Sequence, residues 1–390
     1  MRILHVINSL CPEAGGPPEI VRQLARAHIE VDASMEVVCL DDPSDPFLAA
    51  FPCTVHAIGQ SFLGRYGLST KLWSWLRSNS QRFDGIVMHG IWTFPSVALR
   101  FVTRSQGIPY VVFVHGALDP WFDRQYPLKH FKKRLYWPIQ YPILRDALAV
   151  IFTAELERDM AKSNYRPNKW NSMIIPLGII DPEEDRPDST AQIETFSRKF
   201  PALRGRRHLL FLARLHEKKG CDLLIEAFAR VAASVPDVDL VVAGPDQSGM
   251  QAKLQALAEQ LGIAGRVHWP GMIVGDLKWG ALRTCEALLL PSHSENFGVA
   301  VVEALAVGRP VLISDKVNIW REIEGDHAGL IDDDSLEGTE RMLLRWFNLP
   351  LADRDVMAAH ARPCFLGRFE MSRTAAAINR AFARSVSEVE

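Results

Sequence analysis

The feature that most constrains the fold is an alternation of short apolar runs with helix-length segments. It occurs twice along the 390 residues. Apolar runs that end at polar, glycine or proline residues are typical of parallel strands buried on both faces, with helices as crossovers. The first half therefore predicts a doubly wound parallel sheet. Its predicted strands are 2–7, 35–40, 85–89, 110–115, 149–153 and 172–176, with helices such as 17–30 and 69–80.

The pattern is interrupted between residues 181 and 207, where the chain is polar, then basic and glycine-containing. Such a change of composition is typical of a domain boundary. It predicts an N-terminal domain at 1–185, a linker at 186–207 and a C-terminal domain at 208–365. Residues 366–390 are predicted as a helix that packs back across the domains. The second half has predicted strands at 208–213, 238–243, 267–269, 287–290 and 311–314, and helices at 221–233 and 249–261.

Composition narrows the possible functions. The net charge is −2, so no basic surface argues for nucleic acid. Six cysteines are scattered without CxxC pairs or histidines at metal spacing, which predicts reduced thiols and a cytoplasmic protein. Residues 2–10 have too short an apolar core for a signal peptide and are better read as a strand. The sequence contains no run of 18 apolar residues, so no transmembrane segment is predicted.

The segment 292–305 lies between two apolar strands and predicts a loop followed by a helix at 297–307. Glu295 comes at the end of the loop, and Glu303 comes about two turns into the helix. Eight residues of helix span roughly 12 Å. Because a helix N-terminus offers free amides and a positive dipole end to phosphate, one acid at each end suits a sugar nucleotide.

Two cations precede this segment on the predicted strand-to-helix loop of the second domain. Arg214 and Lys219 can both reach one diphosphate there, although a solvated charged loop is the alternative. Beside the Glu295–Glu303 segment the diphosphate interpretation is favoured. In the first domain, Gly15 and Gly16 follow the first strand without GxGxxG spacing, so a turn and a ligand contact remain equally open.

Three further features have two interpretations each. His115 ends an apolar strand and either packs or caps it, or faces a cleft beyond the strand's carboxyl end. The run 332–334 either caps a helix from 336 or forms an Asp-x-Asp metal site. The segment 121–137 mixes basic and aromatic residues. It is either a solvated helix with a buried aromatic side or a contact to an anionic membrane or acceptor lipid.

Taken together and in this order, these motifs resemble the retaining glycosyltransferases of family 4, of the bacterial polysaccharide-assembly type. That family has the GT-B architecture of two facing Rossmann-like domains with an interdomain cleft. The resemblance covers nearly the whole chain, and its most specific part is the Glu-x7-Glu pattern with arginine and lysine upstream. The matching residues are Gly15-Gly16, His115-Gly116, Pro176-Leu177-Gly178-Ile179, Arg214, Lys219-Gly220, Gly271-Met272, Glu295 and Glu303.

The resemblance implies a role for each residue. Glu303 would bind ribose hydroxyls, and Arg214 and Lys219 would hold the diphosphate. Glu295 and Asn296, with the amides of Phe297, Gly298 and Val299, would hold the donor sugar. His115 would line the reaction centre, Met272 would lie near the nucleobase, and Gly15 and Gly16 would approach the donor.

The implied activity is metal-independent, retaining hexosyl transfer without a cofactor. UDP-glucose is the first donor to consider and GDP-mannose the second, with a glycan or lipid-linked acceptor in surface-polysaccharide synthesis. A cytoplasmic location with peripheral contact at the inner membrane face fits this role. Three departures from the family pattern bear on the choice of sugar: Ala213, Asn296 and Leu177. A sugar-nucleotide epimerase, a nicotinamide oxidoreductase and a non-catalytic nucleotide-sugar-binding protein remain alternatives.

Overall fold

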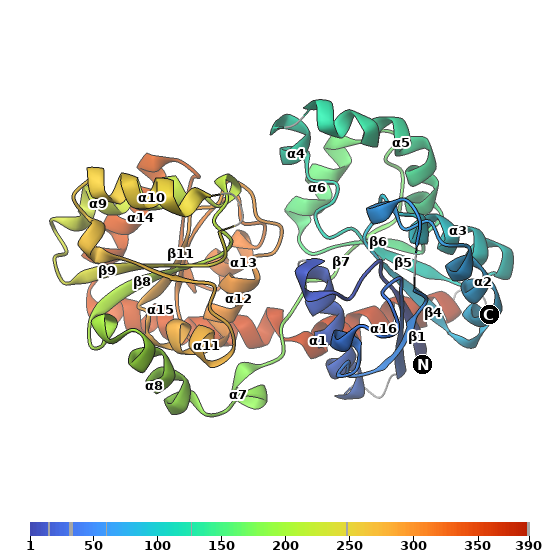
Figure 1. Cartoon of the computed structure of the whole chain (residues 1–390), viewed down its shortest axis with the longest axis horizontal. Helices are drawn as coiled ribbons and strands as arrows, with labels where there is room; N and C mark the ends of the chain where they lie inside the picture. The colour runs from blue at the N-terminus through green and yellow to red at the C-terminus, as the bar shows by residue number, and fades with distance from the viewer. Residues whose placement is uncertain (15, 31–33, 60, 126, 247–248, 388–390) are drawn as a thin grey trace. The chain divides into compact units, whose positions relative to one another are not determined.

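The chain forms two compact units in the computed structural model, which describes residues 1–14, 16–30, 34–59, 61–125, 127–246 and 249–387 (Figure 1). One unit consists of Met1–Ile180 and Met371–Glu390, and the other of Asp181–Glu370. Each has a parallel sheet with helices packed around it. The predicted fold class, two Rossmann-like α/β domains, is confirmed.

The first unit has a seven-stranded sheet in the order β3-β2-β1-β4-β5-β6-β7. Strand β3 was not predicted, because its sequence Thr-Val-His-Ala at the sheet edge is only partly buried and carries little apolar signal. The strands are β1 (Arg2–Val6), β2 (Ser34–Cys39), β3 (Thr54–Ala57), β4 (Gly85–His89), β5 (Tyr110–Phe113), β6 (Ala149–Phe152) and β7 (Ser172–Ile174).

The last helix of the chain belongs to this unit. α16 packs on α1, and the Phe382 ring fills the space in which a side chain at Gly85 would lie. The Thr374 hydroxyl donates to the Pro176 carbonyl at 2.9 Å. The helices are α1 (Gly16–Glu30), α2 (Thr70–Asn79), α3 (Phe94–Gln106), α4 (Pro120–Gln125), α5 (Pro127–Arg145), α6 (Glu155–Asn164) and α16 (Met371–Ser387), with short η1 (Pro12–Ala14), η2 (Pro46–Leu48), η3 (Gly64–Tyr66) and η4 (Ser80–Arg82).

The second unit has a six-stranded sheet in the order β10-β9-β8-β11-β12-β13. The strand order reverses between β8 and β11, which are hydrogen-bonded neighbours although they are far apart in sequence. Strand β13 was not predicted, since only two of its four residues are apolar and it is only partly buried. The strands are β8 (Arg207–Leu212), β9 (Val238–Ala243), β10 (Val267–Gly271), β11 (Ala287–Leu290), β12 (Val311–Ser314) and β13 (Gly329–Asp332).

The stretch 186–207, expected as a linker, contains helix α8, which packs closely on α11. Phe196 of α8 is buried, and the Gln192 carbonyl occupies the space beside Gly280 that any larger residue would need. The helices are α7 (Pro182–Asp185), α8 (Ser189–Lys199), α9 (Cys221–Ala232), α10 (Met250–Gln260), α11 (Gly275–Thr284), α12 (Val299–Ala306), α13 (Trp320–Gly325), α14 (Leu336–Asn348) and α15 (Leu351–Cys364), with short η5 (Pro201–Leu203), η6 (Glu217–Lys219), η7 (Ala264–Arg266) and η8 (Phe365–Phe369). Among the described helices of both units, none has the length and apolarity needed to cross a membrane.

Candidate functional site

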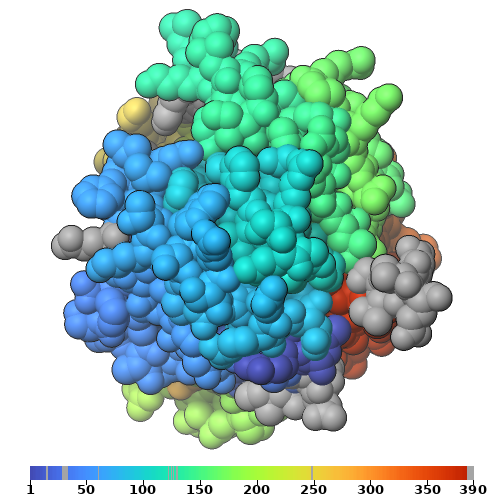
Figure 2. Space-filling model, turned by 90° about the vertical axis from the view of Figure 1, so that its right-hand side faces the viewer, coloured from blue at the N-terminus to red at the C-terminus, as the bar shows by residue number. Residues whose placement is uncertain are grey.

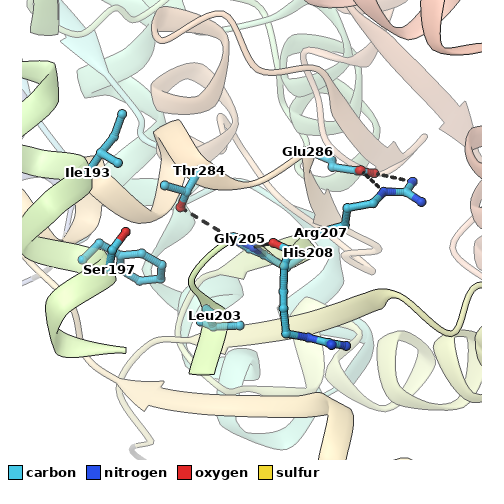
Figure 3. A pocket seen from close by; sticks show the side chains of 10 residues that line it. Ile193, Ser197, Leu203, Gly205, Arg207, His208, Thr284 and Glu286 are labelled. Atoms are coloured by element: carbon cyan, nitrogen blue, oxygen red, sulfur yellow. Dashed lines mark hydrogen bonds and ion pairs between the residues drawn. The ribbon is translucent and has the colours of Figure 1, made fainter. Parts of the chain in front are cut away.

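In the second unit, a ligand can bind at the amino ends or at the carboxyl ends of the strands. A cavity of about 380 Å³ lies at the amino ends, which are the less suitable place. It opens at the amino ends of β8 and β11, beside α8 (Figure 3). Its cation Arg207 is paired with Glu286 and, at 2.8 Å, with Asp237. In open α/β sheets, ligands bind beyond the carboxyl ends of the strands, where the strand order reverses. The loops that follow β8 and β11 at that end therefore form the candidate site.

These two loops are tied together by the Lys218 carbonyl. It accepts from the His293 amide and from the Ser292 hydroxyl, both at 2.8 Å. Gly220 makes the approach possible, because a Cβ at this position would overlap the Pro291 carbonyl and its φ is +64°. Only glycine combines a left-handed conformation with no side chain.

The closest contact across the loops joins two of the predicted site residues. The Lys219 ammonium lies against the Glu295 carboxylate, and both side chains are largely buried. Burial lowers the pKa of Lys219 to about 7, and the nearby Lys218 and Arg214 cations add to this effect. The contact with Glu295 works in the opposite direction, because a carboxylate favours the charged ammonium. Arg214 is exposed and has no ion-pair partner among the described residues.

Backbone bonds to the next loop fix the position of Glu295. Its amide donates to the Lys316 carbonyl at 2.9 Å, and its carbonyl accepts from the Asn318 amide at 3.0 Å. The Glu295 carboxylate also accepts from the Asn296 amide at 3.1 Å. The Asn296 side chain is 3.4 Å from that of Asn318. The carboxylate is thus held at the carboxyl end of the sheet by the loop itself.

The helix after this loop begins later than predicted. α12 starts at Val299 rather than at Phe297, because Gly298 has φ +76° and breaks the helical path. Phe297 is buried, with its ring centroid 6.0 Å from that of Phe369, so only its backbone can face a ligand. The first amides of a helix have no intrahelical partner. Val299 and its neighbours therefore present N–H groups beside Glu295.

Glu303 lies within α12 and has a partner that the sequence interpretation missed. Its carboxylate is 2.5 Å from the Lys278 ammonium of α11, and the residue is 8% exposed. Lys278 also lies over the ring of Trp279, 4.6 Å from its centroid. A lysine on an amphipathic helix carries no motif of its own, so only the packing of α11 on α12 reveals this pair.

Met272 also lies at the carboxyl ends of the strands of this sheet. It follows β10 directly and is 68% exposed, and Val274 beside it is 60% exposed. The Gly271 carbonyl accepts from the Gly244 amide at 2.9 Å, which fixes the start of this loop. Met272 and Val274 thus expose apolar side chains on the loop that follows the carboxyl end of β10.

The acidic run 332–334 begins at the last residue of β13 and serves local structure. Asp332 is 2.5 Å from Arg341, and Asp334 is 3.0 Å from His293. The helix predicted from 336 does start there, but its cap is Ser335, whose hydroxyl accepts from the Gly338 amide at 2.9 Å. Throughout the described ranges, no three histidine, cysteine, aspartate or glutamate side chains are grouped as metal ligands.

In the first unit, His115 follows β5 in an unusual conformation with φ +49°, and it is half-buried. Its Nε2 atom is 3.0 Å from Nδ1 of His89. Burial lowers the pKa of His115 to about 4. Gly15 lies outside the described residues. Gly16 begins α1, and a Cβ there would meet nothing within 4 Å in the described part of the chain, so no contact with those residues requires glycine at this position.

A buried carboxylate that the sequence interpretation missed supports the loop of His115. Glu157 of α6 accepts from the Gly116 amide at 2.8 Å and from the Thr153 amide at 2.7 Å. Burial raises the pKa of Glu157 to about 7. One side chain thereby links the loops that follow β5 and β6.

Two family models match the chain, one for each unit. Residues 15–178 match the glycosyl transferase 4-like domain, and residues 192–362 match glycosyl transferases group 1. The D-inositol 3-phosphate glycosyltransferase of Geodermatophilus obscurus is 27% identical over 95% of this chain and 84% of that protein. The GDP-mannose:cellobiosyl-diphosphopolyprenol alpha-mannosyltransferase of Xanthomonas oryzae pv. oryzae is 26% identical over 81% and 79%. The chain spans about half the length of another relative, the D-inositol 3-phosphate glycosyltransferase of Paenarthrobacter aurescens, with 28% identity over 49% of this chain and 46% of that protein.

Solved structures share the architecture over the whole chain. Alr3699/HepE of Anabaena in complex with UDP superimposes with a TM-score of 0.75 at 19% identity, covering 100% of both chains. A glycosyltransferase from Rickettsia africae gives 0.78 at 13% identity, covering 98% of each. At these identities the similarity concerns the fold.

Proposed function

Because the chain belongs to the glycosyltransferases of the GT-B fold, we propose that it transfers a sugar from a nucleoside diphosphate to an acceptor hydroxyl group. The observation that carries the proposal is the Lys219–Glu295 contact at the strand-order reversal of the second unit. A cation for phosphate and a carboxylate for sugar hydroxyls meet there beside the first amides of α12. This is the chemistry that a nucleotide sugar needs.

In the proposed reaction the bond between the anomeric carbon and the diphosphate breaks, and negative charge grows on the leaving oxygen. Arg214, Lys219 and the N-terminal amides of α12 would stabilise that charge. Glu295 would accept hydrogen bonds from sugar hydroxyls, with Asn296 beside it. In the first unit, His115 is the residue that we propose lines the reaction centre.

We propose retention of the anomeric configuration. The acids Asp315 and Asp334 of the adjacent loops are both ion-paired with Lys316, which supports a mechanism without a protein nucleophile. The leaving phosphate would itself accept the proton of the acceptor hydroxyl on the same face of the sugar. The cations of the loop after β8 would balance the diphosphate charge without a metal ion.

The donor is proposed as UDP-glucose first and GDP-mannose second. One solved neighbour, Alr3699/HepE, is described in complex with UDP-glucose, and one curated relative is named for GDP-mannose. A panel of nucleotide sugars tested by thermal shift should give a rise in Tm with one base and one sugar above the others, because a ligand stabilises the state that binds it. No rise with any nucleotide sugar, free nucleoside diphosphate included, would reject the proposal.

Changing Glu303 to alanine should raise the KM for the donor with kcat nearly unchanged. Ribose contacts are the same in the ground state and the transition state, so their loss weakens binding without slowing the chemistry. Since alanine also leaves Lys278 unpaired, Lys278→Ala is the matched control for the loss of the ion pair alone. Steady-state kinetics with the identified donor would test this. An equal fall in kcat with an unchanged KM would contradict the ribose assignment.

The acceptor is proposed as a glycan or lipid-linked intermediate of surface-polysaccharide synthesis, reached at the cytoplasmic face of an anionic membrane. α5 supports this, because it exposes four apolar side chains along one stripe. Figure 2 shows the blue-green segment that contains α5 at the surface of the first unit. Two residues of the basic-aromatic segment 121–137 do not belong to this stripe. Trp137 is buried, and the Lys133 ammonium lies 5.4 Å from the Trp92 ring centroid. The exposed stripe is Leu128, Phe131, Leu135 and Ile139.

Replacing Phe131 and Leu135 with serine should weaken binding to vesicles that contain anionic lipid. Each buried apolar side chain contributes about 1.5–3 kcal/mol, so the loss should be at least about tenfold. Leu351→Ser with Val356→Ser, two exposed apolar residues of α15, is the matched control and should leave vesicle binding unchanged. Cosedimentation measures both. Equal binding by the α5 variant and the wild-type chain would remove the membrane from the proposal.

A further inference from the structure

Three imidazole rings form a hydrogen-bonded chain that ends at His115. They come from neighbouring strands of the first unit: His5 from β1, His89 from β4, and His115 from the loop after β5. His5 Nδ1 is 2.8 Å from His89 Nε2, and His89 Nδ1 is 3.0 Å from His115 Nε2. The rings are stacked, with centroids 5.1 and 5.3 Å apart.

Neutral imidazole carries one N–H and one bare nitrogen. Within this chain, a ring that accepts at one nitrogen must donate at the other, so all the bonds point the same way. Only two states exist. Either every proton is on Nδ1 and His115 presents an Nδ1–H group, or every proton is on Nε2 and His115 presents a bare Nδ1.

Burial keeps the rings neutral. His5 is 0% exposed and His89 is 3% exposed, and desolvation lowers the pKa of each well below its ordinary value. Their neighbour His28 is also buried, and its Nδ1 is 2.9 Å from the Leu24 carbonyl. A carbonyl only accepts, so neutral His28 has its proton on Nδ1 and does not supply one to His5.

The His5 end of the imidazole chain determines which of the two states is present. Among the residues that the structure describes, none forms a hydrogen bond with the buried Nε2 atom of His5. An N–H group that is buried without an acceptor is rare in folded proteins, and it costs the desolvation of that group. The bare nitrogen therefore belongs at His5 Nε2, which places the protons on Nδ1 of all three rings.

We propose that His5 and His89 are positioning residues that hold His115 as a neutral hydrogen-bond donor, with its Nδ1–H group directed to an oxygen of the sugar substrate. The inference rests on the proposed function and extends it, because it assigns His115 a donor role and excludes a general-base role. The backbone of the loop is fixed independently, by Glu157 at Gly116 and by the Trp92 indole, which donates to the Ala117 carbonyl at 3.2 Å. The imidazole chain adds the orientation and the tautomer of the ring.

Nitrogen NMR of the 390-residue chain labelled with ¹⁵N-histidine tests the tautomer directly. The His115 signals are assigned from their absence in His115→Gln. We expect the proton on Nδ1 of His115, His89 and His5 at neutral pH. A proton on Nε2 of His115 would overturn the proposal. This measurement needs no nucleotide sugar, so its failure is separate from a failure of the proposed function.

His89→Phe keeps a flat ring in the stack but cuts both hydrogen bonds. We expect His115 to become a mixture of tautomers and kcat to fall about 10–100-fold, the usual cost of losing an orienting partner. His28→Phe is the matched control, since it removes a buried imidazole that contacts His5 but does not belong to the imidazole chain. It should change neither the His115 spectrum nor kcat. An unchanged spectrum and unchanged kcat in His89→Phe would also overturn the proposal.

Discussion

Changing Arg214 or Lys219 to alanine should lower kcat by about 10²–10³-fold, the usual cost of removing one group that stabilises transition-state charge. Both cations belong to the loop after β8, and Lys219 is held against Glu295. Their effect grows as the diphosphate leaves, so kcat should fall more than the donor KM rises. Lys253→Ala, an exposed cation of α10, is the control and should retain wild-type kinetics. Variants of Arg214 and Lys219 within a few-fold of wild type would make this loop ordinary solvated surface.

The pH dependence provides a second readout for Lys219. Its pKa is lowered to about 7, so the free enzyme loses this charge as the pH rises, and kcat/KM for the donor should fall on the alkaline side. Lys219→Arg should abolish that fall, because arginine stays charged. Glu295→Gln removes a carboxylate that favours the ammonium and should move the fall to lower pH. A profile that is identical in all three proteins would show that Lys219 is not the titrating group.

Gly220→Ala should destabilise the second unit by about 2–5 kcal/mol and abolish donor binding. A Cβ in the left-handed conformation costs about 1–2 kcal/mol, and overlap with the Pro291 carbonyl adds about 1–3 kcal/mol. Relief of that overlap must separate the two loops that carry Lys219 and Glu295. Chemical denaturation and nucleotide titration measure the two effects.

Gly262 provides the matched control for backbone strain alone. Its φ is +72°, against +64° for Gly220, but nothing lies within 4 Å of a Cβ built on it. Gly262→Ala should therefore cost only about 1–2 kcal/mol and leave donor binding intact. Equal losses in the two variants would mean that the approach of the two loops plays no part in the site.

The sequence predicts the buried strands of the fold closely. β4, β9, β11 and β12 have the predicted limits, because fully buried parallel strands are continuous apolar runs. The half-exposed edge strands β3 and β13 lack that signal and were missed. Phe297 was expected to begin a helix, but the left-handed Gly298 delays the helix start to Val299, a choice that tertiary contacts of the loop decide.

Side-chain partners are harder to predict than strands, because they depend on which strands become neighbours. Glu295 and Glu303 are marked by their spacing around one helix, but the partner of Glu303, Lys278, lies on a different helix. His5, His89 and His115 are far apart in sequence and meet because β1, β4 and β5 are adjacent in the sheet. Such contacts follow from the strand order, which periodicity alone does not determine.

Proton NMR of the reaction between the 390-residue chain and the nucleotide sugar that the thermal-shift panel selects tests retaining sugar transfer directly. The spectrum follows the loss of the donor and the anomeric proton of the product, with water as the acceptor if no glycan is accepted. We expect release of the nucleoside diphosphate and a first-formed product with the donor's anomeric configuration, also in the presence of EDTA. An inverted anomeric coupling in the first-formed product, or an epimerised nucleotide sugar without release of the diphosphate, would contradict retaining sugar transfer.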